Sequence, residues 1–254
     1  MLLTRLKTKK TTIPETAMVL AAGRGTRLAP LTDTVPKPLT EVDGKALIDH
    51  ILERLIAVGV KRVVVNTFHL GEQIESHLAG RTDVEIVISR EDSLLDTGGG
   101  VVNALPLLGT EPFFVINGDS LWVDAMKPTL ERLAEAWHEK TMDVLLLLHP
   151  SARVSGSLGR GDFTMGPMGN LTRREERRVA PYTYMGASIL HPRLFEGAPD
   201  GAFSLNLLYD KAEEAERLFG ALHDGLWYHI STIDDLETAR RFYAQGHVPD
   251  VPFF

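Results

Sequence analysis

The chain of 254 residues contains no cysteine. This absence excludes a disulfide framework, a zinc site built on thiolates and a cysteine nucleophile. It fits a reducing compartment, and we expect the protein in the cytoplasm. No apolar run reaches the roughly 20 residues that a membrane span needs. The basic opening segment "MLLTRLKTKKTTIPE" lacks the apolar core of a signal peptide, so we expect no membrane partner.

Positive charge is also scarce. Lysine and arginine number 27 against 34 aspartates and glutamates, which gives a formal net charge of −7. Nonspecific nucleic-acid binding depends on many cationic contacts with phosphates, so this balance argues against a nucleic-acid partner. A small basic pocket for a phosphorylated metabolite stays compatible with the overall charge.

Short apolar runs and amphipathic segments alternate along residues 1–150. The apolar runs, typical of buried strands, are residues 17–22, 61–67, 84–89, 113–118 and 142–149. The amphipathic segments, typical of helices, are residues 46–59, 70–80, 99–109 and 126–140. The alternation predicts a Rossmann-like α/β fold, in which a mostly parallel mixed sheet has helices on both faces.

Ligands of such sheets bind at the carboxyl ends of the strands. We therefore expect the loops after Ala22, Asn66, Ser89 and Ile116 to line one crevice.

The pattern changes near Pro150. Residues 151–181 are rich in glycine, serine and arginine and show weak periodicity. Beyond them the sequence predicts a strand over 182–192 and helices over 204–220 and 233–246. Residues 218–231 predict a hairpin with its turn at Asp224 and Gly225. Histidines 50, 77 and 138 are expected on helix surfaces.

The segment "LAAGRGTRLAPLTDTVPKPL", residues 20–39, has the composition of a phosphate-binding loop. A dinucleotide fingerprint needs a third glycine where Leu28 stands, and an acidic residue where the second strand ends at Asn66. The P-loop string G-x4-G-K-[ST] is missing from the sequence. An NAD-dependent oxidoreductase and a P-loop enzyme are therefore disfavoured.

A different phosphate site remains possible in this segment. Backbone amides from Gly23 to Thr26 can bind anionic oxygens, and Arg27 adds a planar guanidinium. Lys37 lies between Pro36 and Pro38, which restrict the backbone around it. Such a loop suits a triphosphate whose α-phosphorus is attacked.

These residues resemble the signature of the sugar-1-phosphate nucleotidyltransferases. Further agreement comes from "DTGGG" (96–100), "VINGDS" (115–120) and "YTYMGASILHPRLF" (182–195), so the likeness covers about residues 17–239. The resemblance implies the fold of nucleotide-diphospho-sugar transferases, here without a β-helix extension. It also implies that an NTP and a sugar 1-phosphate, with Mg²⁺, give an NDP-sugar and pyrophosphate.

The domain boundaries follow from this reading. We expect a flexible tail over 1–16 and a single domain over 17–254, with a nucleotide-binding half (17–150) and a sugar-binding half (151–254).

Asp119 follows a predicted strand, where one carboxylate can hold Mg²⁺ together with phosphate oxygens. The alternative is an ordinary turn hydrogen bond. In "WYHIST" (227–232), His229 stands where the family commonly has a second metal-binding aspartate, and Ser231 stands where it has glycine. His229 is therefore a weak metal ligand, a phosphate contact or a hydrogen-bonded histidine without chemistry.

The candidate residues fall into four groups. The expected catalytic residues are Arg27, Lys37 and Asp119. The expected nucleotide-binding residues are Leu20, Ala21, Ala22, Gly23, Gly25, Thr26, Arg27, Asn66, Gln73, Asp96, Thr97, Gly98 and Gly99. The expected sugar-binding residues are Asn117, Thr183, Tyr184, Gly186 and Arg174. The expected metal ligands are Asp119 and His229. Gln73 has an equally good alternative as a solvated helix residue, and the Glu-Lys-Pro element common in the family is missing.

The resemblance favours UTP and N-acetylmuramate 1-phosphate as substrates, which belong to cell-wall recycling. Mannose 1-phosphate with GTP, or glucose 1-phosphate with UTP or dTTP, are the alternatives. A non-catalytic regulatory protein that binds an NDP-sugar is an alternative of another class. We expect a monomer or a small homo-oligomer.

Overall fold

A computed structural model gives the fold, and it describes residues 12–153 and 160–247. The strands of the first half are β1 (Thr16–Leu20), β2 (Glu41–Val42), β3 (Lys45–Ala46), β4 (Arg62–Thr67), β5 (Glu85–Arg90), β6 (Phe113–Asn117), β7 (Ser120–Val123) and β8 (Val144–Pro150). Those of the second half are β9 (Phe163–Met165), β10 (Leu171–Arg173), β11 (Tyr182–Leu190), β12 (Leu218–Leu222) and β13 (Leu226–His229). The α-helices are α1 (Leu47–Ala57), α2 (Gly71–Leu78), α3 (Asp96–Leu108), α4 (Thr129–Ala136), α5 (Asn206–Glu214) and α6 (Ile233–Ala244).

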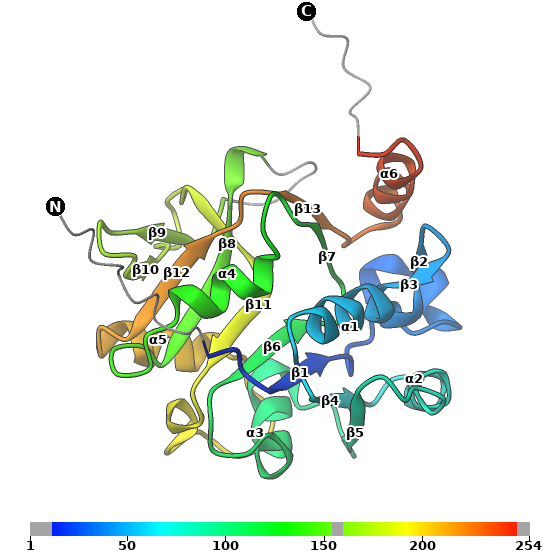
Figure 1. Cartoon of the computed structure of the whole chain (residues 1–254), viewed down its shortest axis with the longest axis horizontal. Coiled ribbons are helices and arrows are strands. Elements are labelled where there is room, and N and C mark those ends of the chain that lie inside the picture. The colour runs from blue at the N-terminus through cyan, green and yellow to red at the C-terminus, as the bar shows by residue number, and fades with distance from the viewer. Residues whose placement is uncertain (1–11, 154–159, 248–254) are drawn as a thin grey trace, which may run out of the picture.

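Nine strands of the described residues form one sheet that runs through the molecule (Figure 1). Its main path is β10-β9-β11-β6-β1-β4-β5, and β8 joins β11 to β12. Strands β6, β1, β4 and β5 are mutually parallel, while β11 runs antiparallel to both β6 and β8. The predicted mixed sheet is therefore confirmed.

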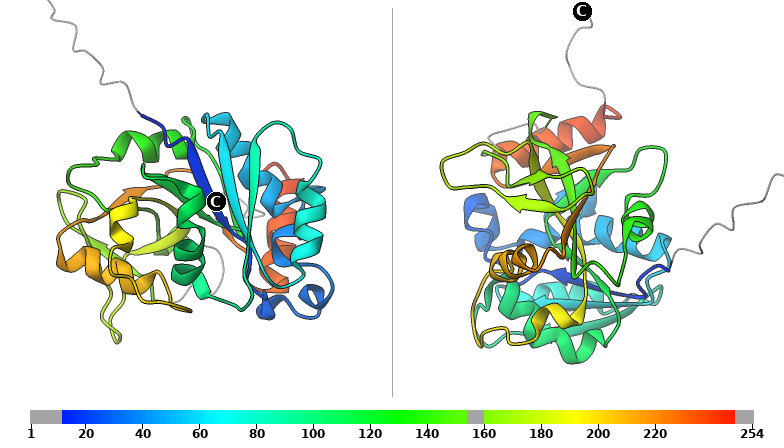
Figure 2. Two further views of the ribbon diagram at one scale, coloured as in Figure 1. Left: turned by 90° about the horizontal axis from the view of Figure 1, so that it is seen from below. Right: turned by 90° about the vertical axis from the view of Figure 1, so that its left-hand side faces the viewer.

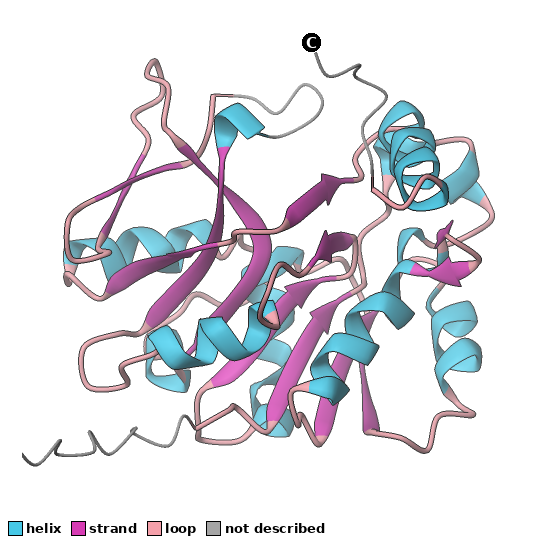
Figure 3. Cartoon of the chain, turned by 45° about the horizontal axis from the view of Figure 1, so that its top comes forward, coloured by secondary structure: helices cyan, strands magenta, loops and turns pink. Residues whose placement is uncertain are grey.

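Helices cover both faces of this sheet (Figure 2; Figure 3). Alternation along β1 explains how two faces become apolar: Ala17 and Val19 point to one core, and Met18 points to the other. The first core includes apolar residues of α1, α2 and α4, and the second includes those of α3 and α5. The three-layer arrangement follows from these two cores.

A third, smaller apolar cluster holds the loop after β1. Leu28 is fully buried there, where it packs with Val42, Leu47, Leu121, Ile230, Leu236 and Ala239. The residue that breaks the dinucleotide fingerprint is therefore a core residue, and it fixes the loop against β7, β13 and α6.

The predicted hairpin over 218–231 is wrong. β12 pairs in parallel with β8, whereas β13 pairs antiparallel with β7 in a separate two-stranded sheet. The turn at Asp224 and Gly225 takes the chain from one sheet to the other. Alternating residues identified the two strands, but their partners lie far away in the sequence.

Several boundaries also differ from the prediction. β1 begins at Thr16 and Ile13 packs against the first core, so the expected tail is fixed from Ile13 onwards; residues 1–11 of that tail lie outside the described residues. α4 is shorter than predicted because it starts after Pro128 and ends before Trp137. α5 ends at Glu214, and the left-handed backbone of Glu216 (φ 56°) separates it from β12.

The predicted surface position of His50 is wrong, because its ring is buried and its Nε2 lies 3.0 Å from the Val42 carbonyl oxygen. Strands β7, β9 and β10 were not predicted. In residues 12–153 and 160–247, no helix has both the length and the hydropathy that crossing a membrane requires.

Candidate active site

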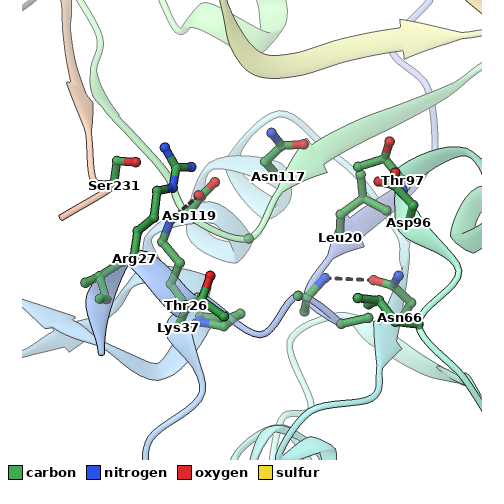
Figure 4. Close-up of a pocket in the computed structure, with 18 residues that line it drawn as sticks. Leu20, Thr26, Arg27, Lys37, Asn66, Asp96, Thr97, Asn117, Asp119 and Ser231 are labelled. Carbon is green, nitrogen blue, oxygen red and sulfur yellow. Dashed lines mark hydrogen bonds and ion pairs between the residues drawn. The ribbon is translucent and has the colours of Figure 1, made fainter. Parts of the chain in front are cut away.

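The carboxyl ends of β1, β4 and β6 meet in one cleft, whose volume is about 440 Å³. The loops after β1, β5 and β6 supply most of its wall, together with Asn66 at the end of β4. The crevice expected from the strand order is thus present. It is lined by Leu20, Ala21, Ala22, Gly23, Gly25, Thr26, Arg27, Leu28, Lys37, Pro38, Asn66, Leu94, Asp96, Thr97, Asn117, Gly118, Asp119 and Ser231 (Figure 4).

Gly25 gives the loop after β1 its shape. Its backbone is left-handed (φ 63°), which disfavours other residues. A Cβ atom at this position would lie 3.0 Å from Thr32 Cγ2 and 3.1 Å from Lys37 Cβ. The carbonyl oxygen of Gly25 accepts hydrogen bonds from Leu28 N (2.8 Å) and Thr32 Oγ1 (2.9 Å). This close packing places the Cβ atom of Lys37 beside the glycine loop.

Lys37 and Asp119 form an ion pair inside the cleft, through Nζ and Oδ2. The two side chains come from segments 82 residues apart, and only 11% and 32% of their surfaces are exposed. Gly118 allows this meeting, because its N–H donates to the Leu20 carbonyl oxygen at 2.9 Å and a Cβ atom would lie 2.7 Å from that oxygen.

Arg27 and Ser231 line the same cleft as this pair, and Figure 4 shows both on the side of the cleft where Asp119 lies. Arg27 is exposed and makes no hydrogen bond or ion pair within the described residues. Ser231 is buried, and its hydroxyl has no hydrogen-bond partner in the described part of the chain. Arg27, Lys37 and Asp119 therefore share one site.

Asn66 is a buried brace beneath the glycine loop. Its Oδ1 accepts from Ala21 N at 2.7 Å, and its Nδ2 donates to Glu91 Oε1 at 2.7 Å. Both ends of the amide are thus used inside the protein, although the residue lines the cleft.

The start of α3 forms the opposite wall. Asp96 and Thr97 line the cleft there (Figure 4). Gly98 and Gly99 do not line it, because their N–H groups donate to the Phe203 carbonyl oxygen at 2.8 and 3.2 Å. A Cβ atom on Gly99 would lie 2.2 Å from the Gly201 carbonyl oxygen. These two glycines allow the loop before α5 to pack closely on the helix.

Asn117 lines the cleft, and Gly186, predicted to contact the sugar, packs against Asn117 without lining the cleft. Gly186 in β11 has a left-handed backbone (φ 76°), and a Cβ atom there would lie 2.7 Å from Asn117 Nδ2 and 2.5 Å from Ser120 Oγ. Packing against Asn117 and Ser120 therefore already requires glycine at position 186, whether or not this residue contacts a sugar.

The other predicted sugar-binding residues lie outside this cleft. Thr183 is buried, with its hydroxyl 2.9 Å from Ser151 Oγ. Tyr184 and Arg174 line a second cavity of about 620 Å³, together with Asp162, Phe163, Arg173, Glu176, Asn206 and Asp210. Burial raises the pKa of Tyr184, so its hydroxyl stays protonated at neutral pH.

Two predicted residues lie near the cleft without lining it. His229 on β13 pairs with Ser120, and burial lowers its pKa against the opposing charge of Asp119. Gln73 on α2 is exposed, and its Nε2 donates to the Thr34 carbonyl oxygen at 3.0 Å. This position fits a solvated helix residue better than a residue that contacts the nucleotide base.

Sequence reasoning did not assign Leu28, Pro38, Leu94, Gly118 or Ser231 to the site. Gly118 and Pro38 directly adjoin predicted residues, so proximity in sequence could have indicated them. Leu94 is 41% exposed, and an apolar side chain open to solvent within a loop is a weak signal for an apolar part of a ligand.

The carboxylates that line the cleft, within the described residues, are Asp96 and Asp119, on opposite sides (Figure 4). In the part of the chain that the structure describes, no three or more histidine, aspartate or glutamate side chains lie together as a possible metal site. This donor set fits Mg²⁺, which keeps several waters and uses one or two carboxylates plus substrate phosphates. It does not fit a metal held by protein ligands alone.

Comparisons with known proteins agree with this geometry. The profile of the family described as "Nucleotidyl transferase" matches residues 16–156. N-acetylmuramate alpha-1-phosphate uridylyltransferase of Caulobacter vibrioides is 41% identical over 222 residues, which cover 85% of this chain and 92% of that protein. The enzyme of the same name from Neisseria meningitidis serogroup B is 36% identical over 228 residues, covering 88% and 96%.

More distant similarities extend this result. Mannose-1-phosphate guanylyltransferase catalytic subunit beta of Drosophila pseudoobscura is 29% identical over 233 residues, covering 89% of this chain and 62% of the relative. A crystal structure of UDP-glucose pyrophosphorylase with UDP-glucose superposes with a TM-score of 0.74 at 17% identity, covering 92% and 100% of the chains, which confirms the fold. The chain belongs to the nucleotidyl transferase family, as its signature segments predict.

Proposed function

We propose that this protein transfers a uridylyl group from UTP to N-acetylmuramate 1-phosphate, which yields a UDP-sugar and pyrophosphate. The observation that carries the proposal is the convergence of the glycine loop, Arg27, Lys37 and Asp119 on one cleft. Anion-binding amides, two cations and one carboxylate are the groups that transfer between two phosphates requires.

The reaction joins two phosphates. An oxygen of the sugar phosphate attacks the α-phosphorus of UTP, a P–O bond forms, and the bond from the α-phosphorus to the bridging oxygen breaks as pyrophosphate leaves. The attacking oxygen is already anionic, so the chain needs no general base. Its task is to position the two substrates and to neutralise their charge.

Each cation has a place in this scheme. The amides of Gly23 to Thr26 and the Arg27 guanidinium hold the β- and γ-phosphates, and stabilise pyrophosphate as it leaves. Lys37 leaves Asp119 to bind the attacking phosphate, since it lines the cleft beside that carboxylate. Thr97 and the exposed Leu94 adjoin the base and ribose.

Asp119 would hold the Mg²⁺ ion with its carboxylate, and the remaining ligands would be substrate phosphates and water. When bound, the ion supplies positive charge that offsets the phosphates of both substrates. His229 does not line the cleft, although the charge of Asp119 acts on its imidazole.

The choice of substrates draws support from the relatives. Both uridylyltransferases named for N-acetylmuramate match this chain over nearly their whole length. The guanylyltransferase named for mannose 1-phosphate is less similar and longer, which makes GTP with mannose 1-phosphate the second candidate. Intact Arg27, Lys37 and Asp119 argue against a non-catalytic binding protein.

Pyrophosphate release tests the proposal. The purified chain is mixed with UTP, GTP, CTP or dTTP and each of several sugar 1-phosphates, with and without Mg²⁺. We expect the highest kcat/KM with UTP and N-acetylmuramate 1-phosphate, and no turnover without the ion. Preference for GTP with mannose 1-phosphate would select the second candidate, and a lack of turnover with every pair would contradict the enzymatic assignment.

A further inference from the structure

The second cavity lies next to the active-site cleft, because at two points a residue of the cleft wall contacts a close chain neighbour of a residue that lines the cavity. Leu205 N donates to Thr97 Oγ1 at 2.9 Å, and the next residue, Asn206, lines the second cavity. On the other side, β11 passes Gly186 against Asn117 and places Tyr184 in the second cavity two residues away. A sugar phosphate anchored beside Lys37 can therefore extend into this cavity.

Most charged groups of the second cavity already have partners. Arg173 Nη1 lies 2.6 and 2.7 Å from the two carboxylate oxygens of Asp210. Asp162 Oδ2 accepts from Tyr184 N at 2.9 Å. Asp162 and Glu176 are both exposed, so water and salt screen their charges.

Arg174 differs from these groups. Its Nε donates to the Gly161 carbonyl oxygen at 2.8 Å, and its Nη1 donates to the carbonyl oxygens of Glu175, Glu176 and Arg178 at 2.8 to 3.2 Å. Within the described residues it pairs with no carboxylate, and its Nη2 makes no hydrogen bond. The guanidinium is thus held in place by neutral groups, while its charge and its Nη2 group remain available.

We propose that the second cavity receives an acidic substituent of the acceptor sugar, and that Arg174 binds its carboxylate. The inference rests on the proposed function and extends it to substrate selection. N-acetylmuramate differs from N-acetylglucosamine by a lactyl ether that ends in a carboxylate. A pre-positioned guanidinium binds a carboxylate strongly, because charge and hydrogen-bond direction match.

The test compares two acceptors that differ only in the lactyl group. The ratio of kcat/KM for N-acetylmuramate 1-phosphate to that for N-acetylglucosamine 1-phosphate is measured with UTP for the wild type and Arg174→Gln. We expect the ratio to fall about 10- to 100-fold in the variant, the range for a hydrogen bond to a charged group. Arg174→Lys keeps the charge but lacks the guanidinium nitrogens that the loop carbonyls hold in place, so its ratio should lie between the two.

The control is Arg178→Gln, on the same loop, whose exposed side chain pairs with Glu175 outside the cavity. It should keep the wild-type ratio. An equal loss for both sugars in Arg174→Gln would show that Arg174 only braces the loop, and would overturn the inference. A wild type that does not discriminate between the two sugars would overturn it as well.

Calorimetric binding separates this inference from the proposed function. If no pyrophosphate appears with any sugar, the proposed function fails. The dissociation constants of the same two sugar phosphates for the wild type and Arg174→Gln then still decide the inference. It holds if only the acidic sugar binds more weakly to the variant.

Discussion

The Lys37–Asp119 ion pair connects two residues with separate tasks. In the absence of substrate each neutralises the other, so neither charge stands alone in a partly enclosed cleft. In the proposed mechanism, a substrate phosphate at Lys37 and a Mg²⁺ ion at Asp119 would have to separate the pair. A lysine suits such exchange, since its flexible stem carries a single point charge from one partner to another.

Lys37→Ala is expected to lower kcat at least about 100-fold, the loss typical of one electrostatic donor in an active site. Steady-state pyrophosphate release measures this effect. The matched control is Lys45→Ala, which removes an exposed lysine paired with Glu53 at 2.7 Å. Turnover close to that of the wild type in Lys37→Ala would remove this lysine from the mechanism.

Gly186 combines a left-handed backbone with crowding from Asn117 and Ser120. Gly197 has the same left-handed backbone conformation (φ 70°), but a Cβ atom there would meet nothing within 4 Å. We expect Gly197→Ala to lower the free energy of unfolding by about 1 kcal/mol. Gly186→Ala should lower it by about 2–4 kcal/mol, because crowding adds to backbone strain. Urea denaturation measures both, and equal losses would contradict the crowding argument.

At the scale of elements, α3 contains glycine at a position where close packing requires it, although glycine has a low helix propensity. Alanine is favoured over glycine in a helix interior by about 1 kcal/mol. Gly99→Ala should nevertheless lower the free energy of unfolding by about 1–3 kcal/mol, because its Cβ atom would collide with the Gly201 carbonyl oxygen. Thermal and urea denaturation test the sign.

Gly80→Ala serves as the control for this variant, since a Cβ atom at Gly80 has open space around it. Its effect should stay within about 0.5 kcal/mol. Stabilisation by Gly99→Ala would mean that the loop before α5 moves freely away from the helix.

The elements of the first half could be predicted because their signals are local. The apolar runs of β1, β4 and β6 are buried on both faces, and α1 repeats its apolar residues at helical spacing. The partners of β12 and β13 could not be predicted, because pairing with β8 and β7 depends on contacts across the molecule. The three-residue strands β9 and β10 are too short to show a period.

The same distinction applies to the site. The alternation of strands and helices predicts that the residues after β1, β5 and β6 share one crevice, and the signature segments assign Arg27, Lys37 and Asp119 to it. The second cavity could not, because it forms where β9, β10 and β11 meet α5. Asn66 was predicted as a ligand contact, yet its brace between Ala21 and Glu91 becomes visible only in three dimensions.

At the scale of the whole molecule, buried histidines make stability depend on pH. Burial lowers the pKa values of His50, His149 and His223 below their usual 6.5. Below about pH 6.5 the unfolded chain binds protons at these residues more readily than the folded protein does. The free energy of unfolding should therefore fall as the pH drops from 7 to 5.5.

Urea denaturation at several pH values measures this dependence. The double variant His149→Gln/His223→Gln should show a smaller slope of unfolding free energy against pH. An unchanged slope in the double variant would assign the pH dependence to other groups.

The burial of Leu28 has a consequence for how the protein acquires its activity during synthesis. This leucine belongs to the phosphate-binding loop, yet its neighbours Leu236 and Ala239 lie in α6. While the ribosome has not released α6, one side of the apolar socket around Leu28 stays open to water. A nascent chain can thus assemble its central sheet early, but the loop that we propose to bind the triphosphate is fully packed only when α6 docks.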